Sequence, residues 1–230
     1  MKRVSFSASF PACLAVLLTV MFLIPSAASA GAYDDLEEAL IRGDSPTAIA
    51  LIERGMDVNT VDRQGNTLLI QAVRRDLPEL FDFLLQRRTR LNVRNRNGET
   101  ALSIAAYSGQ SAYVQRLVEA GAEVNFYGWP PLAYAAFNGH TAIVDYLLKH
   151  GAEIDASTEN GSTALFFAAR YGHRDVVELL LRHQANVTRV NETGDTAVDW
   201  AARASNTDIE DLLRAAGGRS GKATVIELSK

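Results

Sequence analysis

The sequence has almost no cysteine, since Cys13 is the only one in 230 residues. A chain with one thiol cannot form an internal disulfide, and it offers neither paired redox cysteines nor a set of thiolate metal ligands. The fold must therefore be stabilised by an apolar core, for which 47% hydrophobic residues are sufficient.

Blocks of basic residues and motifs of catalysis are also missing. The 23 Lys and Arg residues are outnumbered by 27 Asp and Glu residues, which gives a formal net charge of −4. An acidic chain without a basic block is a poor partner for nucleic acid or for an anionic membrane. No serine has the context of a nucleophile elbow, no Gly-rich loop is placed for phosphate, and no carboxylate pair is placed for acid–base chemistry. We therefore predict that the protein is not an enzyme and binds no cofactor.

The first thirty residues are typical of a secretory signal peptide. Lys2 and Arg3 form a positive start, Leu14–Ile24 is apolar, and Ala28–Ala30 fits the small-residue rule for cleavage. The apolar run is about half of the roughly twenty residues that span a bilayer, so an uncleaved membrane anchor is the less favoured alternative. Cys13 lies at the start of this run rather than at its end, which argues against a lipoprotein. Export without disulfides favours a bacterial periplasm, and secretion is the alternative.

The rest of the chain repeats with a period of about 33 residues. An alanine recurs within the first helix-length pattern at steps of 33, 33, 30, 33 and 33 residues: Ala39, Ala72, Ala105, Ala135, Ala168 and Ala201. A polar series has the same single short step: Asn59, Asn92, Asn125, Asp155 and Thr188. Each unit contains two helix-length patterns split by a short turn, as in the stretch Thr163–Leu181 of the fifth unit. Neither pattern can bury its apolar face without a neighbouring unit.

Short sequences recur within these units. They include Gly98-Glu99-Thr100-Ala101-Leu102, Gly161-Ser162-Thr163-Ala164-Leu165, the junctions Gly139-His140 and Gly172-His173, and the ending Gly121-Ala122-Glu123-Val124-Asn125. This pattern resembles the ankyrin repeat family, and the resemblance covers nearly all of the chain after the leader. It implies an all-α, ankyrin-repeat solenoid of about six helix-turn-helix units with β-turn or hairpin fingers. We predict a cleaved signal peptide over 1–30, a repeat domain over 31–217 with units 31–61, 62–94, 95–127, 128–157, 158–190 and 191–217, and a C-terminal tail over 218–230.

Local signals within the units predict how the helices begin. A glycine allows the tight turn at each finger tip, and a threonine two residues later is placed to cap the first helix. These threonines are Thr67, Thr100, Thr163 and Thr196. Ser45-Pro46 is interpreted as the cap and first residue of a second helix. We expect the tail from Gly218 to be mobile as far as the apolar run Val225–Leu228.

Histidines are predicted to be structural. His140 and His173 are 33 residues apart, as are His150 and His183, and histidines locked to a repeat usually cap or pack a helix rather than bind a metal. The resemblance also implies a histidine in each first helix that bonds to the next repeat. Other residues stand at those positions, so we expect these bonds between repeats to be absent: Ile70, Ser103, Ala133, Phe166 and Asp199.

The largest departure from the repeat is the 30-residue step. It shortens the finger between the third and fourth units by three residues and leaves Asn125–Pro131, which contains Phe126, Tyr127 and Trp129. Trp129 has two interpretations that the sequence does not separate. It either contacts a partner or fills the space left by the missing residues.

The resemblance implies that finger tips and the exposed ends of the first helices line a concave face that binds a partner. On that face the middle is aromatic, the N-terminal side is rich in arginine, and the C-terminal side is more acidic. Tyr, Trp and Arg are the residue types enriched at binding hot spots. The predicted partner-binding residues are Arg63, Arg74, Arg75, Arg96, Tyr107, Tyr127, Trp129, Phe137, Arg170 and Tyr171.

The predicted function is therefore recognition of another protein by a monomer in the bacterial periplasm, where it holds, protects or regulates its partner. No nucleic acid, metal or membrane insertion after cleavage is expected. One alternative is an inhibitor or immunity-type partner of a toxic or stress-related enzyme. Further alternatives are a secreted effector that acts in a host and an enzyme whose site has no recognisable motif.

Overall fold

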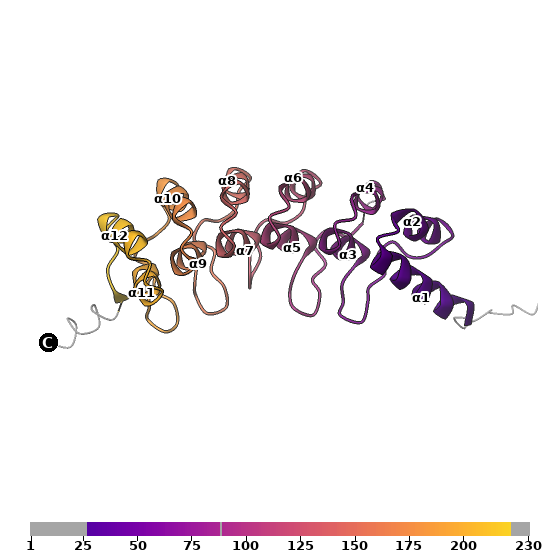
Figure 1. Ribbon diagram of the computed structural model, residues 1–230, viewed down its shortest axis with the longest axis horizontal. Coiled ribbons are helices and arrows are strands. Elements are labelled where there is room, and N and C mark those ends of the chain that lie inside the picture. The colour runs from indigo at the N-terminus through magenta and orange to yellow at the C-terminus, as the bar shows by residue number, and fades with distance from the viewer. Residues whose placement is uncertain (1–26, 88, 222–230) are drawn as a thin grey trace, which may run out of the picture.

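The protein is described here by a computed structural model that covers residues 27–87 and 89–221. This part of the chain forms twelve α-helices in six successive pairs. Odd-numbered helices form one row and even-numbered helices a second row, while the connecting fingers project from the odd-numbered row (Figure 1). The helices are α1 (Ala27–Arg42), α2 (Ser45–Glu53), α3 (Leu68–Arg74), α4 (Pro78–Gln86), α5 (Ala101–Tyr107), α6 (Ser111–Glu119), α7 (Pro131–Phe137), α8 (Thr141–Lys149), α9 (Ala164–Tyr171), α10 (Arg174–Arg182), α11 (Ala197–Arg203) and α12 (Thr207–Ala215).

The predicted all-α solenoid is confirmed by this arrangement. The predicted signal peptide falls outside the described residues up to position 26, as does the tail beyond position 221. Cleavage after Ala30 would remove the first four residues of α1 and leave its buried positions, Leu36, Ala39 and Leu40, in the mature chain. Within 27–87 and 89–221, no helix is both long and apolar enough to cross a membrane.

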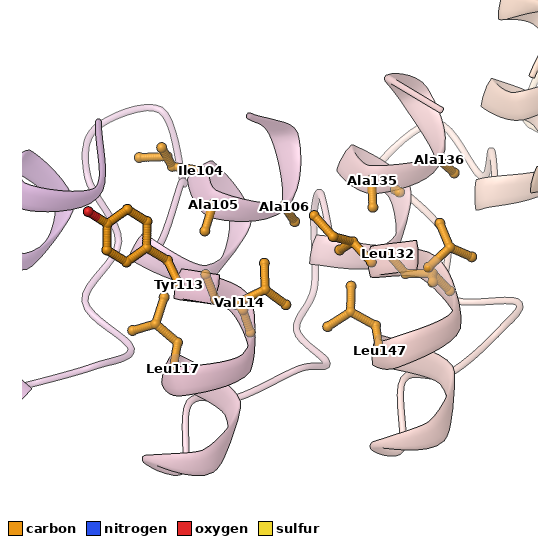
Figure 2. Close-up of a cluster of buried hydrophobic side chains, with 14 of the residues drawn as sticks. Ile104, Ala105, Ala106, Tyr113, Val114, Leu117, Leu132, Ala135, Ala136 and Leu147 are labelled. Carbon is orange, nitrogen blue, oxygen red and sulfur yellow. The ribbon is translucent and has the colours of Figure 1, made fainter. Parts of the chain in front are cut away.

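The two rows differ in how much of each helix is buried. In α5 every residue from Ala101 to Ala106 is buried, because α5 packs against α3 on one side and α7 on the other. Small side chains such as Ala105 and Ala135 allow this close approach. Helix α6 buries a single face, and its Val114 and Leu117 meet the side chains of the odd-numbered row in the core (Figure 2). The core is therefore a continuous layer between the two rows.

The polar series of the repeat joins each unit to the next. The side-chain oxygen of Asn92 accepts a hydrogen bond from the backbone N–H of Glu123 at 2.9 Å. The same bond recurs along the chain between Asn59 and Arg90, Asn125 and Glu153, and Asp155 and Asn186. Each of these side chains satisfies a backbone donor near the end of the next unit, which explains the regular spacing of the series.

A second polar series lies just before the even-numbered helices. His140 Nε2 lies 3.0 Å from the carbonyl oxygen of Tyr107, and His173 Nε2 lies 2.9 Å from that of Phe137. Gln110 and Asn206 occupy the same register and donate to carbonyl groups of the preceding unit. The structural role predicted for these two histidines is confirmed, and hydrogen bonds between repeats are formed from a different position than the resemblance implied. No group of three potential metal ligands occurs in the described part of the chain.

Threonine caps are formed in three of the four predicted places. Thr67 accepts from Ile70 N, and Thr100 and Thr196 form capping boxes with Ser103 and Asp199. The list of predicted caps is wrong at one position: Thr163 makes no side-chain cap, and its buried Oγ1 has no hydrogen-bond partner within 27–87 and 89–221. The N–H of Phe166 bonds to the carbonyl oxygen of Thr163 instead, so the first turn of α9 satisfies this donor through the backbone.

The start of α2 also corrects a prediction. Ser45 lies inside the helix and is buried, while the cap is Asp44, whose side chain accepts from Thr47 N at 3.0 Å. Asp44 was missed because the serine beside Pro46 matches the sequence signature of a cap equally well. The pKa of Asp44 is lowered by its hydrogen bonds with the side chain and backbone of Thr47.

Fingers are built from tight turns that contact one another. In the turn 95–99, Asn95 N donates to Glu99 O, and the positive φ of Gly98 closes the tip. Neighbouring full-length fingers share one backbone bond, from Arg96 N to Gln64 O and from Glu192 N to Asn160 O, each 3.0 Å long. Among the described residues, the shortened finger makes no such bond through 126–129. The side chain of Arg94 reaches it instead by a 3.0 Å hydrogen bond to Tyr127 O.

The beginning of the tail is packed on the last unit, which contradicts the expectation that it is mobile from Gly218. Thr196 Oγ1 donates to Arg219 O at 2.8 Å, and Asp199 accepts from Ser220 Oγ and, at 2.9 Å, from Gly221 N. A Cβ at Gly221 would stand 2.0 Å from Gly194 O, so this position requires glycine. The predicted apolar run at 225–228 lies outside the described residues.

Asp199 should make stability depend on acid pH. Burial alone would raise its pKa, but hydrogen bonds from Ser220, Thr196 and Gly221 lower the pKa below its usual value of 3.8. The stability it contributes is therefore present above about pH 4 and is lost as the pH falls further. Asp199→Asn should lower the free energy of unfolding by about 1 kcal/mol at pH 7, an amount limited by partial exposure, and by less at pH 3.

Urea denaturation of the wild type and the variant at both pH values measures this difference. Asp211→Asn, at an exposed position on α12, is the control and should be neutral at either pH. An equal loss at pH 7 and pH 3 would show that the Asp199 charge is not what holds the tail.

Candidate functional site

The ends of the odd-numbered helices form the face that borders the fingers. Arg74, Tyr107, Phe137 and Arg203 are the last residues of their helices, and Arg170 and Tyr171 close α9. Tyr107 and Tyr171 are each 46% exposed, whereas Phe137 is half-buried. Because His140 and His173 bind the carbonyl oxygens of Tyr107 and Phe137, the backbone beneath these side chains is fixed by the next unit.

Seven aromatic side chains run along this face in contact with one another. We call them the aromatic strip: Tyr107, Trp129, Tyr134, Phe137, Phe167, Tyr171 and Trp200. The ring centroids are 5.9 Å apart for Tyr107 and Tyr134, 4.3 Å for Phe137 and Tyr171, and 5.7 Å for Phe167 and Trp200. The strip therefore extends without a break over the last four units.

Three members of the strip were missed by the sequence analysis. They are Tyr134, Phe167 and Trp200, each three residues before an equivalent position at a helix end: Phe137, Arg170 and Arg203. A spacing of three residues places each ring one turn earlier on the same side of its helix. Trp200 and Phe167 are buried and Tyr134 is half-buried, so these three rings form a deeper layer against which the more exposed rings pack. A search at this second register, which uses the same period, would have found them.

Trp129 sits at the centre of the strip. Its ring centroid lies 4.6 Å from that of Phe167, 5.2 Å from that of Tyr134 and 6.2 Å from that of Phe137. The side chain remains half-buried. Trp129 thus fills the space beside the shortened finger and also presents part of its ring on the concave face.

Tyr127 stands apart from the strip at the tip of the shortened finger. It is 76% exposed, which is the largest exposed fraction among the large apolar side chains of the described residues. Arg94 holds this finger in place from the preceding finger. Its guanidinium lies 4.4 Å from the ring centroid of Phe126 and donates a hydrogen bond to the carbonyl oxygen of Tyr127. Arg94 was not predicted as a site residue, and nothing in the repeat pattern singled it out.

The predicted arginines do not gather in one place. Arg63 and Arg75 border a separate hollow of about 430 Å³ between α1 and the first finger, with Asp34 and Glu37 on its other side. Arg96 is exposed on the next finger. These three residues, unlike Arg170, make no recorded ring contact with the strip in the described part of the chain.

Two of the arginines at the end-of-helix register are neutralised by carboxylates. Arg74 pairs with Glu99 of the next unit at 3.0 Å, and Arg203 pairs with Asp195 of its own unit. Arg170 lies between aromatic rings instead, 5.1 Å from the centroid of Trp200 and 5.8 Å from that of Tyr171. Thus Arg170, which has no carboxylate partner among residues 27–87 and 89–221, lies at the C-terminal end of the strip, where the sequence had indicated an acidic surface.

The pKa of one tyrosine in the strip, Tyr134, is shifted away from neutral pH. Burial, followed by the charges of Glu99 and Tyr107, raises the pKa of Tyr134 to about 12. The phenol therefore remains protonated at neutral pH. Flat, rigid rings with polar edges are suited to burying part of another protein surface.

Comparison with known proteins identifies the architecture. A family model described as ankyrin repeats (3 copies) matches residues 69–158 and 153–220. The chain belongs to the ankyrin repeat family. The human ASB11 ankyrin repeat domain has a similar crystal structure, with a TM-score of 0.72, 29% sequence identity, and coverage of 81% of this chain and 89% of that one.

Curated ankyrin relatives match over shorter stretches. The ankyrin repeat domain-containing protein SAT10 of Stachybotrys chartarum is 30% identical over 106 residues, which is 46% of this chain and 6% of that protein. Ankyrin repeat protein 14 of vaccinia virus is 41% identical over 49 residues, or 21% of either chain. The chain thus spans a small part of both relatives. Ankyrin repeats are protein-binding modules and are generally without enzymatic activity, so this chain has the architecture of a binding protein.

Proposed function

We propose that this ankyrin-repeat protein is exported to a bacterial periplasm, where it holds, protects or regulates a partner protein bound to the aromatic strip. The observation that carries the proposal is the unbroken strip itself. Aromatic side chains are not needed at the exposed ends of these helices for packing between units, yet Tyr107, Phe137 and Tyr171 are in ring contact there. Rigid exposed rings bury a large area at a small cost in side-chain entropy.

Export is supported by the leader features around Lys2, Leu14–Ile24 and Ala28–Ala30. Cleavage after Ala30 would leave the buried residues Leu36, Ala39 and Leu40 of α1 in the mature protein. Removal of the leader also removes the only cysteine, so the mature protein needs no oxidative folding step.

Site-specific photo-crosslinking tests the proposed surface. A benzophenone amino acid placed at position 107 or 171 should give covalent adducts of one discrete mass in cells of the source organism. The same probe at Gln115, which is exposed on α6 in the other row, is the matched control and should give none. Mass spectrometry of the protein recovered by osmotic shock should find Gly31 as the first residue.

Two results would contradict this proposal. Adducts from position 115 but not from 107 or 171 would place the partner on the opposite row of helices. A recovered protein that retains Lys2 and Arg3, or that stays with the cytoplasm, would rule out export.

A further inference from the structure

The C-terminal end of the strip contains a cleft of about 360 Å³. It is lined by Arg170, Tyr171, Trp200, Arg203 and Ala204. The lining side chains come from two neighbouring units, α9 and the end of α11 with the residue that follows it. The volume suits one or two side chains of a bound segment rather than a large cofactor.

Arg170 is the cation of this cleft without a carboxylate partner among residues 27–87 and 89–221. Arg74, at the same register, pairs with Glu99, which lies 25 positions later in the next unit. The position equivalent to Glu99 for Arg170 is Asp195, and Arg203 already holds that carboxylate. Arg203 pairs with Asp195 of its own finger. The equivalent position in the finger before Arg170 is Ser162, which is neutral and buried. Two arginines are therefore placed for one carboxylate, and Arg203 takes it, which leaves Arg170 without an acidic partner in the described part of the chain.

Arg170 is also held in a defined place. Its guanidinium contacts the rings of Trp200 and Tyr171, and Asn206 binds its carbonyl oxygen at 3.0 Å. A guanidinium held beside aromatic rings still carries its N–H groups in a planar fork, which can bind both oxygens of a carboxylate. The apolar rings beside it lower the local dielectric and strengthen such a bond.

We infer that this cleft binds the carboxylate of an Asp or Glu side chain from an acidic partner segment that carries an aromatic residue next to it. Arg170 holds the carboxylate, and the neighbouring aromatic residue lies against Tyr171 and Phe137. The inference rests on the proposed function, since it names the chemistry of the segment that crosses the strip. It accounts for a partner-facing cation on a chain whose net charge is negative.

A charged copolymer provides the test. Fluorescein-labelled random poly(Glu,Tyr) should bind the protein in 50 mM NaCl, as measured by fluorescence anisotropy. Arg170→Gln should weaken this binding by about tenfold, the effect expected from losing one charge-assisted contact, and 500 mM NaCl should weaken binding by the wild type. Arg170→Lys, which keeps the charge but loses the planar fork, should fall in between. Arg182→Gln, exposed on α10, is the control and should bind as the wild type does.

Several results would overturn this assignment. The first is that Arg170→Gln binds poly(Glu,Tyr) as tightly as the wild type does. The second is that the wild type binds poly(Lys,Tyr) as tightly as poly(Glu,Tyr), or binds poly(U) more tightly and through Arg170. The third is that poly(Glu,Tyr) binds only after residues 222–230 are removed. Poly(U) binding would indicate a phosphate site, and the last result would make the chain's own tail the occupant. Photo-crosslinks from position 107 that persist unchanged in Arg170→Gln would leave the proposed function standing and remove this inference. If the chain with its native Arg170 gave no photo-crosslinks from position 107 or 171, the proposed function itself would be wrong.

Discussion

Phe81→Ala should lower the free energy of unfolding by about 3–5 kcal/mol, the usual cost of a large cavity in a packed core. Phe81 is fully buried, and its ring centroid lies 4.5 Å from that of Tyr113 in the next unit. The side chain therefore belongs to the interface between the second and third units as much as to α4. In a solenoid each unit is stabilised by its neighbours, so the loss should fall on the first two units.

The positions of the two tryptophans make this regional effect measurable. Trp129 and Trp200 both lie in the C-terminal half of the domain, whereas circular dichroism reports all helices. For Phe81→Ala, part of the dichroism signal should be lost at lower urea concentration than the tryptophan transition. Phe83→Ala, two residues along the same helix and only half-buried, should cost about 1 kcal/mol and serves as the matched control. If both probes shift together, the six units unfold as one cooperative block.

Gly139→Ala should be the second most damaging change, with a loss of about 2–4 kcal/mol. Gly139 has a φ of +75°, where a Cβ alone costs about 1–2 kcal/mol. A Cβ there would also stand 2.5 Å from His173 Nδ1. The ring of His173 would have to move and give up its contact with the carbonyl oxygen of Phe137.

The repeat supplies its own control for this experiment. Gly172 lies one repeat later with a φ of +78°, but its nearest neighbour would be Asn206 Oδ1 at 3.5 Å. Gly172→Ala should therefore show the backbone strain without the clash, and thermal denaturation of both variants isolates the histidine contribution. Adding His173→Ala to Gly139→Ala should recover part of the loss. If the double variant were no more stable than Gly139→Ala alone, the clash with the histidine ring would not be the cause.

The helical architecture could be predicted because the period itself encodes it. A unit that cannot bury its own apolar face must stack on copies, so two series with one spacing were enough to predict about six pairs of helices. Single caps were less certain, because several polar residues near a helix start satisfy the same pattern. Asp44 rather than Ser45 caps α2, and Thr163 leaves the first turn of α9 to the backbone.

Features that depend on contact between distant residues were harder to foresee. The segment Gly218–Gly221 is held by three hydrogen bonds to Thr196 and Asp199, which can form only after α11 has folded. In the candidate site, the exposed rings were predicted from their positions at the helix ends. Tyr134, Phe167 and Trp200 were overlooked because positions one turn earlier were not considered. Within the described residues Arg170 has no carboxylate partner because Arg203 pairs with Asp195, and no spacing rule reveals that pairing.

The shortened finger has a mechanical consequence. Full-length fingers on either side are linked in pairs by backbone hydrogen bonds, from Arg96 to Gln64 and from Glu192 to Asn160, and each bond resists separation of its two fingers. Between the two pairs, the shortened finger is connected by the Arg94 side chain on one side and by the ring contact of Trp129 with Phe167 on the other. Bending that opens or tightens the arc should meet the least stiffness at this central unit. The protein would then bend mainly at this unit, next to Trp129, while the two halves on either side move as stiff bodies. Such bending would close the concave face around a bound partner.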